Sequence, residues 1–482
     1  MKIKNKNTNL KNMTEMVREL FNNYLRRSGL EEKEYQHEGV AWCYNNETNL
    51  DLLVNGGFIV DEMGLGKTII MIGLFVVHYL PRTLIILPPV LIDQWFKQIQ
   101  STTGHSSIVY HGSNKNKITL EDLNNSHIVI TTYGAIKKTS CLLHQVKWSR
   151  IVLDEAHHIR NKNTQIFKGV KLLKSNIRWL VSGTPVQNSK SDFYSLCSAL
   201  NLPSTFYKNP LNLVTIATCY MLRRTKEGVG IVLPEVTINH HIVKWKNEKE
   251  KQFSQQIHSS FHFNKAQQEQ ENQGEENQGE QNQGEQNEEK VMPLLCRFIR
   301  AKQSCILPRL VPFGNITNSS SKLDYVIATL LERRDNEKGK LVFCHFREEI
   351  DEIARRLISA GVTNVATFDG RNSREERVLL LNSKTDVLIL QIQTGCEGLN
   401  LQENYSEIYF VSPHWNPAVE DQAIARCHRI GQTKTVDVFR FQMEGFLEDV
   451  KSIDNYVTTV QENKRIVADD CLLKEKRKRE EE

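Results

Sequence analysis

The ten cysteines of this 482-residue chain stand singly, and no two of them form a CxxC pair. The absence of such pairs argues against a zinc ribbon or a RING-type module, because those sites need paired thiolates at short spacing. Unpaired cysteines in a long chain are instead typical of an intracellular, reducing compartment.

Long apolar runs are missing as well. The longest, Ile69–Val77, ends at His78 and is too short to span a bilayer, so it suits a buried helix. The first residues, MKIKNKNTNLKN, are basic and rich in asparagine, with no apolar segment behind them. We therefore expect neither a signal peptide nor a membrane partner.

Negative charge is concentrated in one segment. Residues 267–290 carry eight Glu and one Lys, a net of −7, so subtracting them from the total of +5 leaves +12 on the rest of the chain. This balance is compatible with a polyanionic partner such as nucleic acid and, equally, with mild surface basicity.

The same segment is repetitive. It contains ENQGE at 271–275 and again at 276–280, followed by QNQGE, and it has no apolar residue to bury. Such a segment cannot offset the entropy of becoming ordered, so we expect a disordered tether. The alternative is an acidic decoy that competes with DNA for a basic groove.

Short apolar runs alternate with helical patterns on both sides of the repeat. The expected strands are GGFIVDE, RTLIILPP, HIVITTY, WSRIVLDEAH and RWLVSGTP before it, and KLVFCHF, NVATFDG, DVLILQIQ, EIYFVSP and DVFRFQ after it. Glu348–Gly361 and Pro417–Gly431 are expected helices. The pattern predicts an α/β fold of two lobes, with parallel sheets flanked by helices and a helical or disordered insert joining them.

The predicted divisions follow from these patterns. They are an N-terminal tail (1–27), a first lobe (28–240), a linker with the acidic repeat (241–320), a second lobe (321–465) and a charged tail (466–482).

DEMGLGKT, residues 61–68, is similar to a phosphate-binding loop but has Asp61 where the general pattern has its first glycine. Gly64 and Gly66 allow a tight backbone path. Lys67 can reach the β- and γ-phosphates of ATP, and Thr68 can hold Mg²⁺. A purely structural glycine turn is the alternative.

A second motif, IVLDEAHHIRN, ends an apolar run with two adjacent carboxylates. Asp154 suits Mg²⁺ coordination, and Glu155 suits orienting or deprotonating the attacking water. A third motif, VSGTPVQN, places the hydroxyls of Ser182 and Thr184 at another strand end, where they could relay between nucleotide and DNA sites.

The sequence EDQAIARCHRIGQ supplies two arginines that could neutralise charge during phosphoryl transfer, and no such arginine is evident in the first lobe. In a helix from Pro417 onward, Arg426 and Arg429 share one face, with Gln422 one turn earlier. Phosphoryl transfer depends on charge neutralisation, to which such arginines contribute. Since neither lobe is complete, we expect ATP to be hydrolysed in a cleft between the two; a solvated basic helix is the alternative.

In order along residues 28–445, these motifs resemble the SWI/SNF-type ATPases of helicase superfamily two. The others that match are YQHEGVAW, LIILPPVLIDQW, ITTY, VFCHF, FDG, GCEGLNL, HWNP and QAIARCHRIGQ. The resemblance is strongest to the branch that contains post-replication repair translocases and a transcription-termination ATPase. It implies two RecA-like lobes, a DNA-dependent ATPase activity, and ATP and Mg²⁺ as cofactors.

The resemblance also implies residue roles. Gln36 recognises adenine, Thr68 and Asp154 hold Mg²⁺, and Arg426 and Arg429 act as fingers beside Gln422. The nucleotide loop comprises Asp61, Glu62, Met63, Gly64, Leu65, Gly66, Lys67 and Thr68. DNA contacts are expected around PPV (88–90), ITTY (130–133), FDG (368–370) and GCEGLNL (395–401).

The resemblance implies translocation along duplex DNA through sequence-independent backbone contacts, with remodelling of protein–DNA complexes. Nucleosome and polymerase are candidate partners, and the expected location is the nucleus, or a viral factory or virion for a compact viral member. A strand-separating helicase, a viral transcription-termination ATPase and a decayed scaffold are alternatives. Arg223 and Arg224 resemble arginines that follow the first lobe, where they brace the lobes, touch nucleotide or face solvent. The chain departs from the family at Gly395-Cys396-Glu397-Gly398, where the family usually has Gly-Gly-Leu-Gly or Gly-Gly-Val-Gly; Glu397 puts the local nucleic-acid contact in question.

Overall fold

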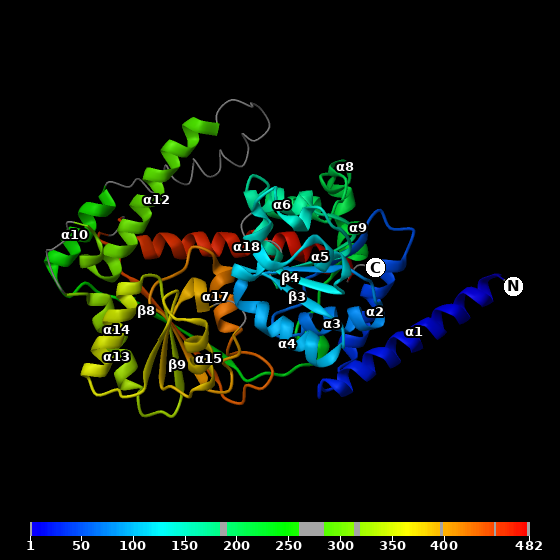
Figure 1. Cartoon of the computed structure of the whole chain (residues 1–482). Helices are drawn as coiled ribbons and strands as arrows, with labels where there is room; N and C mark the ends of the chain where they lie inside the picture. The colour runs from blue at the N-terminus through cyan, green and yellow to red at the C-terminus, as the bar shows by residue number, and fades with distance from the viewer. Residues whose placement is uncertain are drawn as a thin grey trace. The chain divides into compact units, whose positions relative to one another are not determined.

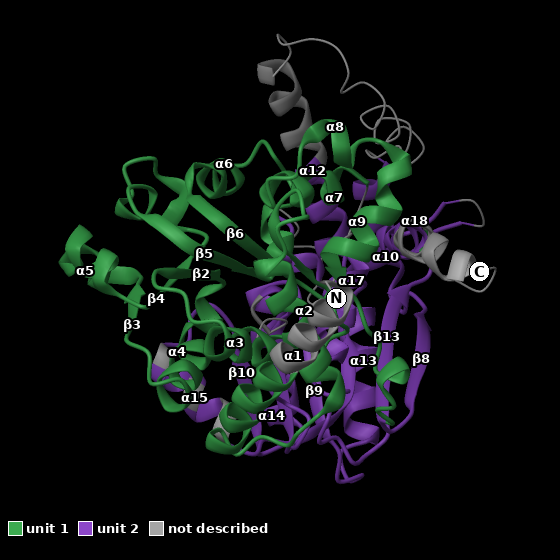
Figure 2. Ribbon diagram, turned by 90° about the vertical axis from the view of Figure 1, so that its right-hand side faces the viewer, with its two compact units in different colours: residues 1–232, 466–482 green, residues 233–465 purple. Residues whose placement is uncertain are grey.

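The structure is a computed structural model that describes residues 2–183, 190–259, 284–312, 319–395, 399–447 and 450–479. It divides into two compact units, drawn in different colours in Figure 2. The first comprises residues 1–232 and 466–482, and the second comprises residues 233–465.

The first unit contains a seven-stranded parallel sheet in the order β3-β4-β2-β5-β6-β1-β7. Its strands are β1 (Asn55–Ile59), β2 (Thr83–Leu87), β3 (Ser107–Tyr110), β4 (Ile128–Thr132), β5 (Lys147–Asp154), β6 (Lys174–Val181) and β7 (Met221–Leu222). Its α-helices are α1 (Lys2–Arg27), α2 (Glu34–Thr48), α3 (Lys67–Val77), α4 (Ile92–Thr102), α5 (Leu120–Asn125), α6 (Gln165–Leu172), α7 (Lys190–Ala199), α8 (Ser204–Tyr207) and α9 (Leu213–Tyr220).

Two hydrophobic cores cover the two faces of this sheet because side chains alternate along each strand. Ile85 and Val152 face a core formed with α1, α2, α3 and α4. Leu84 and Ile151, their neighbours in sequence, face a second core formed with α6, α7 and α9. Burial on both faces explains why these strands are continuous apolar runs rather than alternating ones.

The second unit contains a six-stranded parallel sheet in the order β10-β11-β9-β12-β13-β8, which Figure 1 shows as a fan of strands around β9. Its strands are β8 (Val236–Val243), β9 (Gly339–Cys344), β10 (Val365–Phe368), β11 (Val387–Gln391), β12 (Tyr405–Phe410) and β13 (Val436–Met443). Its α-helices are α10 (Glu248–Ser259), α12 (Gly284–Ile306), α13 (Ser321–Glu332), α14 (Arg347–Ser359), α15 (Arg374–Asn382), α16 (Ile392–Gly395) and α17 (Pro417–Ile424). Helix α18 (Ile453–Arg479) begins in this unit.

The predicted fold class is confirmed: each unit is a parallel sheet flanked by helices, and all ten expected apolar runs form strands. Within the described ranges, none of the helices combines the length and apolar character that a bilayer crossing needs.

Two predicted boundaries differ from the structure. Residues 1–27 were expected to be a tail, but Phe21 and Tyr24 of α1 are buried in a core of the first unit. Residues 236–240 were expected in the first lobe, but they belong to β8, which pairs with β13 along its whole length. Helix α1 is placed by apolar contacts with distant segments, and β8 by its backbone pairing with β13.

The acidic repeat is only partly covered by the structure. Residues 267–283 lie outside the described residues, so the predicted tether is not described there. Gly284–Lys290 form the first turns of α12.

Candidate functional site

The loop between β1 and α3 has the backbone that a phosphate-binding loop requires. Gly64 and Gly66 have φ of 93° and 81°, a region that favours glycine. A Cβ atom at Gly66 would also lie 2.6 Å from Nε2 of Gln36. Helix α3 begins directly at Lys67, so its free N–H groups lie beside the loop, where anions are favoured.

Lys67 folds back onto its own loop. Its Nζ donates to the carbonyl oxygen of Asp61 over 2.8 Å and to that of Glu62 over 3.4 Å. The ammonium group therefore lies inside the curve of the loop, next to Thr68 at the start of α3. This position suits an ammonium group that binds phosphate oxygens.

Asp61 occupies the place of the missing glycine, and its side chain is fully buried. The carboxylate accepts from Arg224, with Oδ1 3.1 Å from Nε of the arginine. The structure therefore gives the Asp61 side chain a protein partner, while its backbone carbonyl oxygen serves the loop by accepting from Lys67. The alternative that Arg224 is a solvated surface residue is wrong.

Gln36, predicted to recognise adenine, lies against the phosphate loop. Its side chain is buried, and its Nε2 donates to the carbonyl oxygen of Leu65 over 3.3 Å. Helix α2 thus places the amide beside the residues that would hold the phosphates.

Asp154 ends β5, and Glu155 follows it in a left-handed conformation with φ of 51°. This conformation is uncommon outside glycine and is found at functional sites. Trp95 donates its Nε1–H to Oδ2 of Asp154 over 2.9 Å, and the backbone N–H of Glu155 donates to Oδ1 over 3.0 Å. The hydroxyl of Tyr133 donates to the carbonyl oxygen of Asp154 over 2.7 Å.

The electrostatics of this pair suit a divalent cation. Burial, together with the neighbouring Glu155 carboxylate, raises the pKa of Asp154 to about 7, while the Trp95 hydrogen bond and Lys67 act in the opposite direction. Two crowded carboxylates are hard oxygen donors of the kind that Mg²⁺ prefers. By the chemistry of its donors, the Asp154–Glu155 pair therefore fits the predicted magnesium site, for which Thr68 is the second predicted ligand.

The end of β6 belongs to the same site. The backbone N–H of Ser182 donates to the carbonyl oxygen of Ile59 over 3.0 Å. A Cβ atom on Gly183 would lie 2.8 Å from Cγ of Met63 and 3.5 Å from Nζ of Lys67. The carboxyl ends of β1, β5 and β6, which are neighbours in the sheet, thus bring three motifs together. Thr184 lies outside the described residues.

In the second unit, the predicted helix is shorter than expected. Helix α17 ends at Ile424 rather than at Gly431, so Arg426 and Arg429 lie in the turns that follow it. Beyond Ile424 the backbone forms tighter turns, in which the N–H of Arg426 donates to the carbonyl oxygen of Ala423 over 3.1 Å, and the carbonyl oxygen of Arg426 accepts from the N–H of Leu401 over 3.1 Å.

The arginines nevertheless form one site. Arg429 donates to the side chain of Asn400. Burial and the nearby Arg426 lower the pKa of the Arg429 guanidinium, so the two positive groups repel each other. Nε2 of Gln422 and Nε of Arg426 are buried and have no hydrogen-bond partner within the described part of the chain. Buried donors without acceptors are costly, and an anionic ligand would satisfy them.

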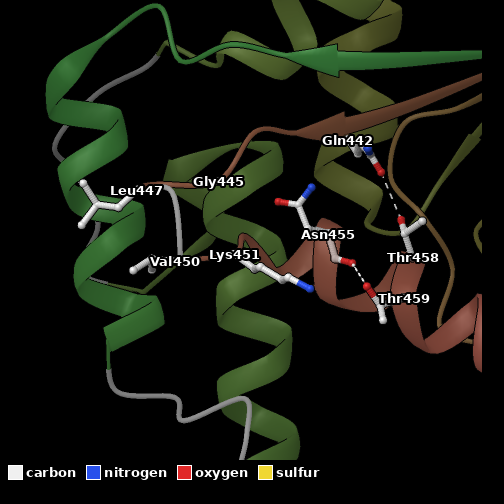
Figure 3. Close-up of a pocket in the computed structure, with 8 residues that line it drawn as sticks. All are labelled: Gln442, Gly445, Leu447, Val450, Lys451, Asn455, Thr458 and Thr459. Atoms are coloured by element: carbon white, nitrogen blue, oxygen red, sulfur yellow. Dashed lines mark hydrogen bonds between the residues drawn. The ribbon is translucent and has the colours of Figure 1, made fainter.

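The predicted DNA-contact loops lie at the carboxyl ends of strands, after β2, β4, β10 and β11. Residues 396–398 of the last loop, including Glu397, lie outside the described residues. Figure 3 shows a cavity of about 410 Å³ elsewhere in the second unit. Its lining residues, among them Lys451 and Asn455, belong to none of the motifs.

Three functional contacts were missed by sequence reasoning. Trp95 stands in the quoted segment LIILPPVLIDQW, but no role was assigned to it. The pairing of Arg224 with Asp61 joins residues 163 positions apart, and that of Arg429 with Asn400 joins residues 29 apart. Local spacing carries no signal for such pairs.

Family comparisons cover most of the chain. Residues 35–308 match the SNF2-related domain, and residues 321–431 match the helicase conserved C-terminal domain.

Curated relatives are similar over most of this chain. An uncharacterized ATP-dependent helicase of Mycoplasma genitalium is 27% identical over 443 residues, which cover 86% of this chain and 40% of the relative. The DNA excision repair protein ERCC-6-like of Homo sapiens is 26% identical, with the same coverage of each chain. Chromodomain-helicase-DNA-binding protein 6 of Rattus norvegicus is 28% identical over 85% of this chain and 16% of its own length. The chain thus spans less than half of each of these relatives.

A solved structure, the Sulfolobus solfataricus SWI2/SNF2 ATPase core in complex with double-stranded DNA, is also similar. It covers 86% of this chain and 88% of its own length, at 24% identity and a TM-score of 0.40.

Proposed function

The chain belongs to the SNF2-related family, and we propose that it is a DNA-dependent ATPase that translocates along duplex DNA and remodels protein–DNA complexes. The family match confirms the resemblance read from the motifs. The enzyme class predicted from those motifs is also that of the family, whose members include proteins named ATP-dependent helicases.

One observation carries the proposal: each unit, taken by itself, gathers polar groups that suit phosphate. The first unit assembles a phosphate loop, Lys67 and the carboxylates of Asp154 and Glu155. The second unit brings together Arg426 and Arg429, with buried donors that have no acceptor among the residues that the structure describes. Because phosphoryl transfer depends on positioning and charge neutralisation, we propose that hydrolysis needs both sets.

The residues would act as follows. Lys67 exchanges its two loop carbonyls for phosphate oxygens when a nucleotide binds. Asp154 and Thr68 hold Mg²⁺, which neutralises phosphate charge when bound. Glu155 orients the attacking water, and the two arginines stabilise the charge that develops during transfer.

Two relatives support DNA as the polymer, since their names describe DNA excision repair and DNA binding. Contacts to the sugar–phosphate backbone carry no sequence information, so we propose sequence-independent binding. We further propose that the protein–DNA complexes it remodels contain a nucleosome or a polymerase. The proposed location is the nucleus, or a viral factory or virion for a viral member.

A strand-separating helicase is the second candidate, favoured by the word helicase in the names of several relatives. The test measures ATPase rates with no polymer, single-stranded DNA, duplex DNA, RNA and nucleosomes, beside strand displacement on a forked duplex. Stimulation by duplex DNA without displacement supports the translocase. Displacement would favour the helicase, and an ATPase rate that no polymer changes would contradict both.

A further inference from the structure

The guanidinium group of Arg224 is bound by two parts of the nucleotide site at once. Its Nε and Nη2 donate to the two carboxylate oxygens of Asp61, and its Nη1 donates to the carbonyl oxygen of Tyr35. The guanidinium carbon also lies 5.3 Å from the centre of the Tyr35 ring. One side chain therefore links the phosphate loop to the start of α2, the helix that carries Gln36.

The backbone around Arg224 follows the same loop. The carbonyl oxygen of Leu222 accepts from the N–H of Val60 over 2.9 Å, and that of Arg224 accepts from the N–H of Glu62 over 2.9 Å. The N–H of Arg224 donates to Oδ1 of Asp61 over 3.0 Å. The loop is thus fixed on one side, from the end of β1 to Glu62.

Helix α2 is shaped to accept this guanidinium group. A Cβ atom on Gly39 would lie 2.9 Å from Nη2 and 3.3 Å from Nη1 of Arg224, and 3.1 Å from Cδ1 of Ile70. A glycine inside a helix is less favourable than alanine, so this position is occupied by glycine at a cost in helix stability. Gly39 stands three residues after Gln36 on α2. The surface of the helix at Gly39, which faces Arg224, therefore lies close to the side-chain amide of Gln36.

We propose that Arg224 is a positioning residue that holds the phosphate loop and Gln36 at a fixed separation, so that one nucleotide is bound by its base and its phosphates together. This inference rests on the proposed function. It also explains why a carboxylate stands where the general loop pattern has glycine: Asp61 is the anchor for Arg224. Bidentate arginine–carboxylate pairs add geometric specificity to their strength, which suits such a role.

Two variants of the full chain separate positioning from folding. Arg224→Ala removes the link but leaves the buried Asp61 carboxylate without its partner, which destabilises the fold. Gly39→Ala keeps every charged group and improves helix propensity, while it pushes the guanidinium group away from α2. Arg27→Ala is the control because Arg27 is an exposed arginine of the same unit, at the end of α1, and has no part in the nucleotide site.

The readout is the affinity for a fluorescent ATP analogue, with unlabelled ATP and GTP as competitors, beside the melting temperature. We expect Gly39→Ala and any folded Arg224→Ala to bind ATP at least tenfold more weakly and to lose part of the preference for ATP over GTP. Arg27→Ala should match the parent. Parent-like affinity and selectivity in Gly39→Ala would overturn the inference, even if its melting temperature changed. A parent chain that bound no nucleotide would instead refute the proposed function.

Discussion

Trp95 donates its indole N–H to the carboxylate of Asp154 over 2.9 Å, and both side chains are buried. This bond orients the Asp154 carboxylate by holding its Oδ2 toward Trp95. Replacing Trp95 with Phe keeps most of the ring but removes the donor. Outer partners of metal ligands typically contribute about 10- to 100-fold in metal affinity or activity. We expect the Mg²⁺ concentration for half-maximal ATPase activity to rise by a factor in that range.

Trp148 provides the matched control for this change. It is equally buried in the same unit, but its indole donates to the carbonyl oxygen of Leu143, away from the motifs. Trp148→Phe should alter the melting temperature without altering the Mg²⁺ requirement. Equal shifts in both variants would show that Trp95 acts on stability alone.

Lys67 and Glu155 are expected to fail in different ways. Lys67→Ala removes the ammonium group that binds phosphate, so both ATP binding and hydrolysis should be lost. Glu155→Gln keeps the shape but removes the charge that orients water, so ATP should remain bound and uncut. Equilibrium binding and single-turnover hydrolysis distinguish the two outcomes. Hydrolysis at the parent rate in Glu155→Gln would contradict the role given to that carboxylate.

Arg429→Ala should lower the turnover rate by about 10³-fold or more, because finger arginines stabilise charge that develops only during transfer. ATP affinity should fall much less. Arg334→Ala is a suitable control, since that side chain is exposed and pairs with Asp335 in the same unit. Equal turnover rates in Arg429→Ala and the parent would contradict the proposal that Arg429 stabilises charge during hydrolysis.

His258 should make the second unit sensitive to acid. The side chain is buried, its Nε2 accepts from the N–H of Ile453 over 3.0 Å, and burial lowers its pKa to about 4. The unfolded chain therefore binds the proton first as pH falls below about 6.5. The contribution of His258 to the free energy of unfolding is complete above that pH. It decreases as the pH falls toward 4, by about 2 kcal/mol between pH 6.5 and 5.

The measurement is the melting temperature of the full chain between pH 7 and 5. His258→Gln should start from a lower value but decline less steeply than the parent. His240→Gln, a change at an exposed histidine of β8, should decline as the parent does. Parallel curves for the parent and His258→Gln would exclude this contribution.

The strands of both sheets could be predicted because parallel strands buried on both faces are short apolar runs, as at Leu84 and Ile389. The nucleotide motifs could be predicted because their residues are contiguous. Whether the predicted roles of these residues are correct stays a prediction for the experiments above.

Other features depend on distant partners and could not be read locally. Helix α17 ends at Ile424, and the turn after it is joined to a distant segment by the bond from the N–H of Leu401 to the carbonyl oxygen of Arg426. From the sequence alone, Asp61 departs from the general loop pattern without an evident reason. The structure supplies the reason, because Asp61 pairs with Arg224, which stands 163 residues later. The burial of α1 was missed because its lysines and asparagines obscure the apolar spacing of Val17, Phe21 and Leu25.

The distance in sequence between β8 and β13 affects how the second unit folds during translation. Thr237 hydrogen-bonds to Asp437, its partner in β13, which lies 200 residues later. The ribosome therefore releases β8 long before the strand that pairs with it exists, and contacts of such large sequence separation form slowly. Until then the backbone N–H and C=O groups that β8 will bond to β13 have no strand to pair with, and unpaired strand edges are the kind of segment that chaperones protect.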